Sequence, residues 1–176
     1  GPVDRWKVVR DQIRDRILDE GWSEEKQAFT QYFGGEELDA SVLMMPIMGF
    51  LAADDSRITS TIDAIERELT VDGLLLRYRP LEVRVDGLPG DEGVFLACSF
   101  WLVQVRAVQG RIDAATSLFR RLLRLRNDLG LFAEEFDPTA GQMVGNFPQA
   151  FTHLALVDAA LALAGQDAHE ITATGD

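Results

Sequence analysis

The chain has 176 residues, 47% of them hydrophobic, so it is long enough to bury the core of one domain or of part of a larger one. Its 29 acidic residues outnumber its 17 basic residues, which gives a net charge of -12. This balance excludes nucleic acids and anionic membranes as expected partners, because phosphate groups are bound by clusters of Lys and Arg, and a neutral or cationic substrate is expected unless arginines converge locally.

The first predicted element is an amphipathic helix over residues 4–20, which Gly21 ends. Residues three or four positions apart form its apolar stripe: Trp6, Val9, Ile13 and Ile17. An irregular or extended piece follows over residues 28–35.

A pair of helices comes next, and the two differ in pattern. Asp39 is a good N-cap for an apolar helix over residues 40–51, which should be buried on all sides and kinked or ended by Pro46. The second helix, residues 53–70, should be half-exposed, with Asp55 or Ser56 as its cap and one apolar face: Ile58, Ile62, Ile65 and Leu69. A turn and a short strand are expected over residues 72–80.

The same order then returns. An apolar helix is predicted over residues 92–108, and an amphipathic helix over residues 110–130 ends at Gly130. An irregular loop or hairpin follows over residues 131–146. A third apolar helix is predicted over residues 147–165, with Pro148 near its first turn.

The two helix pairs are related by an offset of about 57 positions, which is long enough for one helical hairpin. At this offset Gly73 corresponds to Gly130, and Arg77 corresponds to Glu134. An inner helix followed by an outer helix, repeated, is typical of an α/α solenoid or a closed α/α barrel. Equivalent loops then lie on one rim, so Arg77 and Glu134 are expected to face a shared pocket.

Two adjacent carboxylates, Glu134 and Glu135, follow the apolar segment "GLFA". In an extended loop their side chains point opposite ways, so one can face a pocket while the other faces solvent. A pair of solvated loop acids remains an open alternative. Arg77 is equally consistent with a surface ion pair, and Glu92 with an acid stabilised by a helix N-terminus.

Cys98 is the only cysteine and fits a small core residue in a chain from a reducing cytoplasm. His153 lies in an apolar helix and fits a core histidine. A second His or Cys at metal-ligand spacing is absent from the sequence, so neither a metal nor another cofactor is expected. A cytoplasmic location is expected, since no stretch reads as a signal peptide or membrane span.

Three blocks of the sequence resemble the C-terminal half of the catalytic domain of glycoside hydrolase family 15. This is the glucoamylase-like family that includes bacterial trehalases. The blocks begin "LDASVLMMPIMGF", "EGVFLACSFWL" and "AEEFDPTAGQMVGNFPQAFTHLAL", and the likeness runs from Trp6 to about Leu163.

The resemblance implies an all-α fold, part of an (α/α)6 barrel with about six of its helices present. It also implies an inverting hydrolase of α-glucosidic bonds, with an α-glucoside sugar as its substrate. Glu134 maps onto the family's general base. The resemblance implies four substrate-binding residues: Arg77, Tyr78, Glu92 and, less directly, Trp101.

The chain departs from the family pattern at the general acid, which the family carries in an upstream Trp-Glu pair. Here the tryptophans are followed by Lys7, Ser23 and Leu102. Residues 1–176 are therefore expected to be the C-terminal portion of the catalytic domain, without the acid-bearing helices and the N-terminal β-sandwich.

Such a fragment should be nearly inactive alone. It should also cover its open edges by forming a homodimer or by associating with the missing half. Two alternatives from the pattern are a non-catalytic α/α helical-repeat module that binds a protein, and another α/α-barrel enzyme such as a lyase or epimerase.

Overall fold

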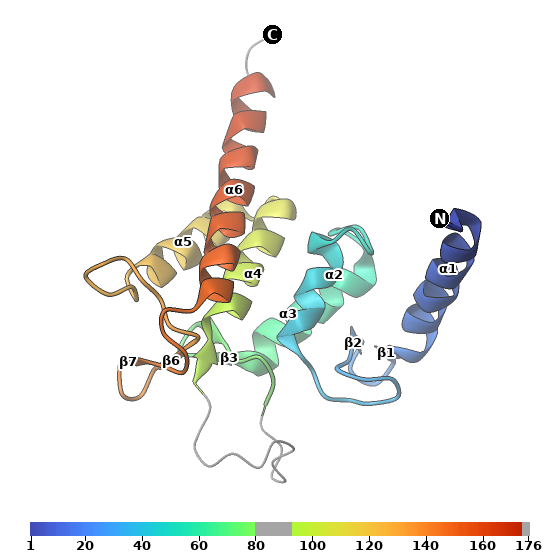
Figure 1. The fold of residues 1–176 in the computed structure, drawn as a ribbon, viewed down its shortest axis with the longest axis horizontal. Coiled ribbons are helices and arrows are strands. Elements are labelled where there is room, and N and C mark those ends of the chain that lie inside the picture. The colour runs from blue at the N-terminus through green and yellow to red at the C-terminus, as the bar shows by residue number, and fades with distance from the viewer. Residues whose placement is uncertain (80–92, 174–176) are drawn as a thin grey trace.

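The structure is a computed structural model that describes residues 1–79 and 93–173, with side chains through Gly165. Its first element is helix α1, Val3–Glu20, which ends where the Gly21 N–H donates to the carbonyl of Ile17. The predicted helix is thus confirmed, but its apolar stripe is largely uncovered. Trp6 is 60% exposed and Ile13 is 55% exposed. Helix α1 lies at one edge of the molecule (Figure 1).

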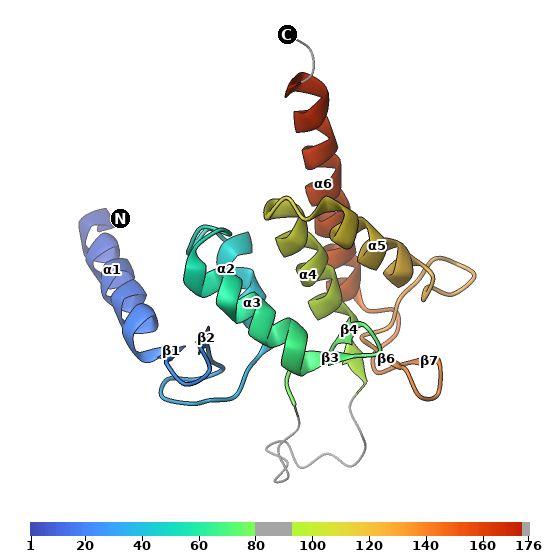
Figure 2. The same cartoon turned by 180° about the vertical axis from the view of Figure 1, so that it is seen from behind.

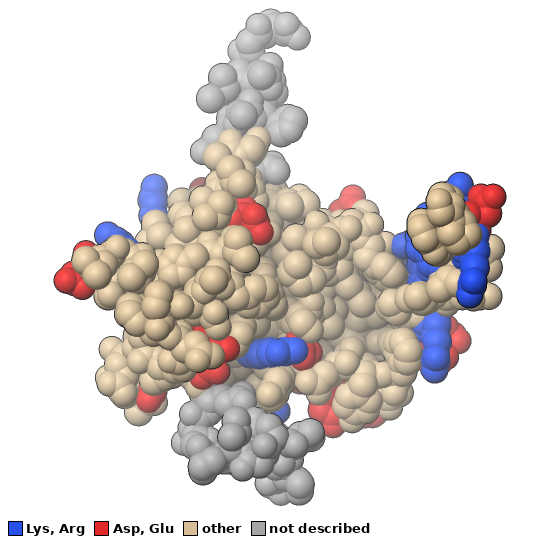
Figure 3. Space-filling model, viewed as in Figure 1, with Lys and Arg blue, Asp and Glu red and all other residues tan. Residues whose placement is uncertain are grey.

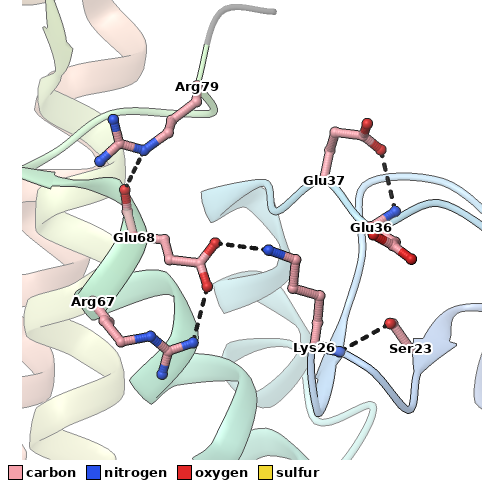
Figure 4. Close-up of polar contacts among 7 residues, drawn as sticks. All are labelled: Ser23, Lys26, Glu36, Glu37, Arg67, Glu68 and Arg79. Carbon is pink, nitrogen blue, oxygen red and sulfur yellow. Dashed lines mark hydrogen bonds and ion pairs between the residues drawn. The ribbon is translucent and has the colours of Figure 1, made fainter.

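A small antiparallel hairpin, β1 (Trp22–Ser23) and β2 (Ala28–Phe29), follows α1 in the segment expected to be irregular or extended. The Phe29 N–H donates to Thr61 Oγ1 at 3.0 Å, which ties the hairpin to helix α3. An ion pair of 3.2 Å between Lys26 Nζ and Glu68 Oε2 makes a second tie (Figure 4). Glu68 also accepts from Arg67, its neighbour on α3, so its carboxylate binds one cation from the hairpin and one from the helix.

The apolar segment after Asp39 is not the long buried helix that its pattern predicts. It forms a 3-10 turn, η1 (Ala40–Leu43), and one turn of α-helix, α2 (Met44–Ile47). The segment ends at Gly49, whose φ of +72° is the left-handed conformation that commonly terminates helices. The expectation of burial on all sides is wrong, since Met48 is 74% exposed.

Helix α3, Ser56–Leu69, is capped by Asp55, whose carboxylate accepts from the Arg57 N–H. Its predicted apolar face is confirmed as buried: Ile58, Ile62, Ile65 and Leu69. The predicted turn follows as a hairpin of β3 (Thr70–Val71) and β4 (Leu74–Leu75).

Helix α4, Leu96–Val108, is the centre of the fold, and nearly all of its residues are buried as its pattern predicts. It packs against α5 (Ile112–Leu123) and α6 (Ala150–Ala173). Helix α5 ends well before the predicted stop at Gly130. Between that end and Gly130, Asn127 Oδ1 accepts from the N–H groups of Leu129 and Leu131 and so favours a turn.

The predicted loop or hairpin over residues 131–146 is a hairpin that joins a three-stranded antiparallel sheet. Its strands are β5 (Val94–Phe95), β6 (Glu135–Asp137) and β7 (Gln142–Val144). Phe95 pairs with Glu135, and Glu135 pairs with Val144.

The β3–β4 hairpin and the β5–β6–β7 sheet lie at the end of the molecule where α4 and α6 begin, and the β1–β2 hairpin lies on the same side of the molecule between α1 and α3 (Figures 1 and 2). This end is called the strand end below. Helix α6 exposes an apolar face of four residues: Phe151, Leu154, Val157 and Leu161. Within the described residues, no helix is both long and apolar enough to cross a membrane.

Candidate active site

The sequence-predicted residues that the structure describes lie mainly at the strand end. Arg77 follows β4, β4 contacts β5, and β5 pairs with the strand that begins at Glu135. Equivalent loops of the two helix pairs therefore do meet at one end. Acidic and basic atoms lie side by side on this part of the surface (Figure 3).

Glu134 is half-buried between the start of helix α4 and the end of the β6–β7 hairpin. Its carbonyl accepts from the Leu96 N–H at 3.1 Å, and its own N–H donates to the Asn146 carbonyl at 2.9 Å. Its Oε2 accepts from Asn146 Nδ2 at 2.8 Å and from the Asn146 N–H at 3.2 Å. Hydrogen bonds thus fix both the main chain and the carboxylate of Glu134.

The segment before Glu134 is anchored from the other side by helix α6 and its approach. The Ala133 carbonyl accepts from Thr152 Oγ1 at 3.1 Å, and the Ala133 N–H donates to the Met143 sulfur at 3.2 Å. The Phe132 carbonyl accepts from the Gln149 N–H at 2.9 Å. Phe132 and Ala133 are each 1% exposed, so the two residues that precede Glu134 are buried in the core.

Glu135 differs from its expected position in solvent. It is half-buried like Glu134, and its Oε2 accepts from the Gly93 N–H at 3.0 Å. The physical reason is the pairing of Phe95 with Glu135, which brings the start of β5 next to this carboxylate. The two glutamates therefore occupy separate, hydrogen-bonded positions, and the alternative of two solvated loop acids does not describe them.

Arg77 is paired with the carboxylate of Asp39, for which the sequence predicted only a role as an N-cap. Asp39 Oδ2 lies 3.5 Å from Arg77 Nε, and the Arg77 carbonyl accepts from the Ala40 N–H at 2.7 Å. The guanidinium carbon of Arg77 lies 5.8 Å from the centre of the Tyr78 ring. Because half of the Arg77 side chain stays exposed, its guanidinium can still reach a ligand.

Asp39 itself is buried, with 3% of its surface exposed. Its Oδ1 accepts from the Ser41 N–H at 2.7 Å, which confirms the predicted cap, and its Oδ2 accepts from Gln31 Nε2 at 3.2 Å. The pattern of the sequence carried no signal for the ion pair with Arg77, since the two residues are far apart in the chain.

The two remaining predicted substrate-binding residues are Glu92 and Trp101. Glu92 lies outside the described residues. Trp101 is 8% exposed and packs edge-on against Phe151 of α6, with ring centres 5.6 Å apart. Trp101 thus belongs to the packing between the two inner helices.

His153 contacts the glutamate segment as part of the core, in line with the simpler interpretation of this residue. Its Nδ1 lies 2.7 Å from the Gln149 carbonyl, and its Nε2 lies 3.4 Å from the Phe132 nitrogen. These partners fit a neutral ring that donates from Nδ1 and accepts at Nε2.

Two further features of the described residues bear on the site. Cys98 is fully buried, and burial together with the charge of Asp39 raises the pKa of its thiol far above its ordinary value, so it does not serve as a nucleophile. Among the residues placed by the structure, no group of three or more His, Cys, Asp or Glu side chains could hold a metal ion.

A hollow of about 900 Å³ lies at the opposite end of helices α3 and α4. It contains none of the predicted site residues and is lined by the start of α3 and the α4–α5 turn: Ala53, Asp54, Thr59, Asp63, Val108, Gln109, Gly110 and Arg111.

Comparison with known proteins connects this geometry to a family. The family model described as glycosyl hydrolases family 15 matches residues 1–161. The trehalase of Mycobacterium tuberculosis is 48% identical over 155 residues, which are 88% of this chain and 22% of that protein. The trehalase of Thermoplasma volcanium is 40% identical over 157 residues, 89% of this chain and 25% of that protein. The chain thus spans about a quarter of the length of the curated relatives it matches.

Solved structures share the fold at lower identity. A bacterial glucoamylase in complex with acarbose matches with a TM-score of 0.79 and 16% identity, covering 93% of this chain and 29% of that one. A wild-type glycosidase matches with a TM-score of 0.76 and 20% identity, covering 93% of this chain and 46% of that one. The predicted fold, an all-α part of an (α/α)6 barrel, is confirmed.

Proposed function

The chain belongs to glycosyl hydrolases family 15, and on this premise we propose that it is the C-terminal part of the catalytic domain of an inverting α-glucoside hydrolase. Trehalose is the favoured substrate, because the curated relatives with 40–48% identity are trehalases. The non-catalytic repeat module is not favoured, since the family model covers residues 1–161.

Glu134 is proposed as the general base. In an inverting reaction one carboxylate removes a proton from water as the water oxygen bonds to the anomeric carbon. The bond from that carbon to the glycosidic oxygen breaks, and a carboxylic acid protonates the departing oxygen. The observation that carries the assignment is the held carboxylate of Glu134, with two N–H groups on Oε2.

The general acid is proposed to come from residues outside this chain. The two carboxyl groups of an inverting enzyme stand about 6.5–9.5 Å apart, and one carboxylate cannot protonate and deprotonate in the same step. No Trp-Glu pair occurs in the 176 residues. The chain would therefore work as part of a longer protein, with the acid-bearing helices and a β-sandwich preceding it.

Sugar binding is proposed for Arg77 and Tyr78 at the strand end, with Glu92 as a further contributor. The partly exposed guanidinium of Arg77, oriented by Asp39, supports its role. A cytoplasmic location is proposed on the single buried cysteine, Cys98.

The decisive experiment compares Glu134→Gln with Glu135→Gln in the full-length protein that contains these residues, with trehalose and maltose as substrates. Loss of the base should lower kcat about 10²–10⁴-fold in the first variant. The second variant is the matched control, because Glu135 is an adjacent half-buried carboxylate, and it should change kcat far less. A Glu134→Gln variant as active as the wild type would eliminate the proposed base.

The isolated 176-residue chain should hydrolyse neither sugar measurably. Robust turnover by this chain that Glu134→Gln abolishes would mean that the acid lies within residues 1–176, and the proposed division of the two carboxyl groups would be wrong.

A further inference from the structure

Asn146 makes three of the contacts that hold Glu134. Its carbonyl accepts from the Glu134 N–H, its own N–H donates to Glu134 Oε2, and its side-chain Nδ2 donates to the same oxygen at 2.8 Å. Since both donors converge on Oε2, rotation of the carboxylate about its last side-chain bond would break two hydrogen bonds at once.

The other carboxylate oxygen, Oε1, accepts no hydrogen bond from the described residues. A carboxylate tied down at one oxygen presents the second in a defined direction. A general base needs this arrangement, because the proton of the attacking water must lie within about 2.6–3.2 Å of the accepting oxygen.

The close approach of the Asn146 backbone depends on Gly145. Its φ is +77°, a conformation that side chains other than glycine rarely adopt. A Cβ at this position would lie 3.1 Å from both Cβ and Oε2 of Glu134. The end of the hairpin is therefore shaped to bring the Asn146 donors onto the carboxylate.

The hydrogen bonds on the Glu134 carboxylate come from two kinds of group. Glu134 receives a side-chain amide in addition to a backbone N–H. The side-chain amide orients the Glu134 carboxylate, and the backbone pairing of the hairpin would form without it.

We propose that Asn146 is a positioning residue for the reaction, which fixes Oε2 of Glu134 so that Oε1 receives the proton of the attacking water. This inference rests on the proposed function, because it presupposes that Glu134 is the base. It assigns to Asn146 no contact with the sugar.

The test measures kcat and KM for trehalose in the full-length protein with Asn146→Ala and Asn146→Asp. Removing the amide should lower kcat about tenfold and leave KM unchanged, because the lost interaction orients the base without binding substrate. Asn146→Asp has the same shape but places a carboxylate beside Glu134, and it should lower kcat further. If the Ala variant does not fold, the isosteric Asp variant carries the test.

Gln142→Ala, an exposed position on β7 of the same hairpin, is the control and should keep wild-type kinetics. If both Asn146 variants keep kcat within twofold of the wild type while Glu134→Gln inactivates the protein, the inference is wrong and the proposed function still stands. Wild-type activity in Glu134→Gln, or no α-glucoside hydrolysis by the full-length wild type, would overturn both.

A spectroscopic readout on the 176-residue chain checks the contact itself. The side-chain amide resonances of Asn146 should shift in Glu134→Gln and stay unchanged in Glu135→Gln. Equal responses to both substitutions, or no response to either, would show that the amide does not hold the Glu134 carboxylate.

Discussion

Asp39 and Arg77 form an ion pair of 3.5 Å between a side chain that is 4% exposed and one that is 50% exposed. The pair joins the start of η1 to the segment after β4, and the Ala40 N–H donates to the Arg77 carbonyl beside it. A buried carboxylate that caps one element therefore also orients an exposed guanidinium on the next, at the end of the molecule that holds Glu134.

Asp39→Ala should lower the free energy of unfolding by about 1–3 kcal/mol. The substitution removes a helix cap and leaves the Ser41 N–H and the Gln31 amide without this acceptor. Urea unfolding followed by circular dichroism measures the change, with Asp54→Ala in an exposed loop as the control. Equal stability of the two variants would contradict the dual role of Asp39.

Glu66 should matter more to stability than its more exposed partner, Arg111. Its carboxylate accepts from Arg106 at 2.8 and 3.2 Å and from Arg111 at 3.2 Å, which joins α3 to α4 and to the turn before α5. Glu66→Ala should cost about 1–3 kcal/mol, because Arg106 is left partly buried without its carboxylate. Arg111→Ala, at a side chain that is 41% exposed, should cost less than about 1 kcal/mol. Thermal unfolding of both variants decides the order.

Cys98 should be unreactive toward thiol reagents until the chain unfolds. Burial, with a smaller contribution from Asp39, raises the pKa of its thiol, while the unfolded thiol ionises near pH ~8.5. The folded state keeps the proton at higher pH than the unfolded state. This contribution to stability is therefore complete below pH ~8.5 and is lost as the pH rises above it, by up to about 1.4 kcal/mol per pH unit.

The Cys98→Ala variant isolates that effect. The difference in unfolding free energy between wild type and variant should be constant from pH 6 to 8 and should shrink above pH ~8.5. A difference that stays constant to pH 10 would show that the buried thiol is not linked to folding in this way.

The apolar face of α6 should drive association of the isolated chain, as a homodimer or with the remaining part of a barrel. Leu154 is 63% exposed and Leu161 is 65% exposed on this face. A double substitution of both by Lys should shift the wild-type chain toward monomer in light scattering across a concentration series. Asp158→Lys, on the same helix, is the charge-matched control. A monomeric wild-type chain at high concentration would contradict the expectation.

The helices that the sequence predicted well are those whose pattern and whose environment agree. Helix α3 has its Asp55 cap and its buried face where the periodicity put them, and α4 is buried on nearly every side. The segment after Asp39 is as apolar as α4 but forms only η1 and α2. An apolar composition shows that a segment can be buried, whereas only its neighbours decide whether it is.

In the candidate site, too, some residues were predicted from the sequence and others were not. The offset between the two helix pairs predicted that Arg77 and Glu134 lie at one end, and the family resemblance supplied Glu134 as the proposed base. Asp39 beside Arg77 and Asn146 beside Glu134 were missed as partners. Their pattern in the sequence, a polar residue before an apolar segment, is common to many turns.

By itself the sequence determined the local preferences of this protein: which faces of its helices are apolar, where Asp55 caps a helix, and where a turn at Gly73 reverses the chain. Those features depend on residues within a few positions of one another. The tertiary structure alone decided that Glu135 meets the Gly93 amide, that Asp39 meets Arg77, and that two N–H groups of Asn146 hold one oxygen of Glu134. These contacts join residues 12 or more positions apart, and their geometry is set by how the hairpins pack on α4 rather than by any preference of the chain between them.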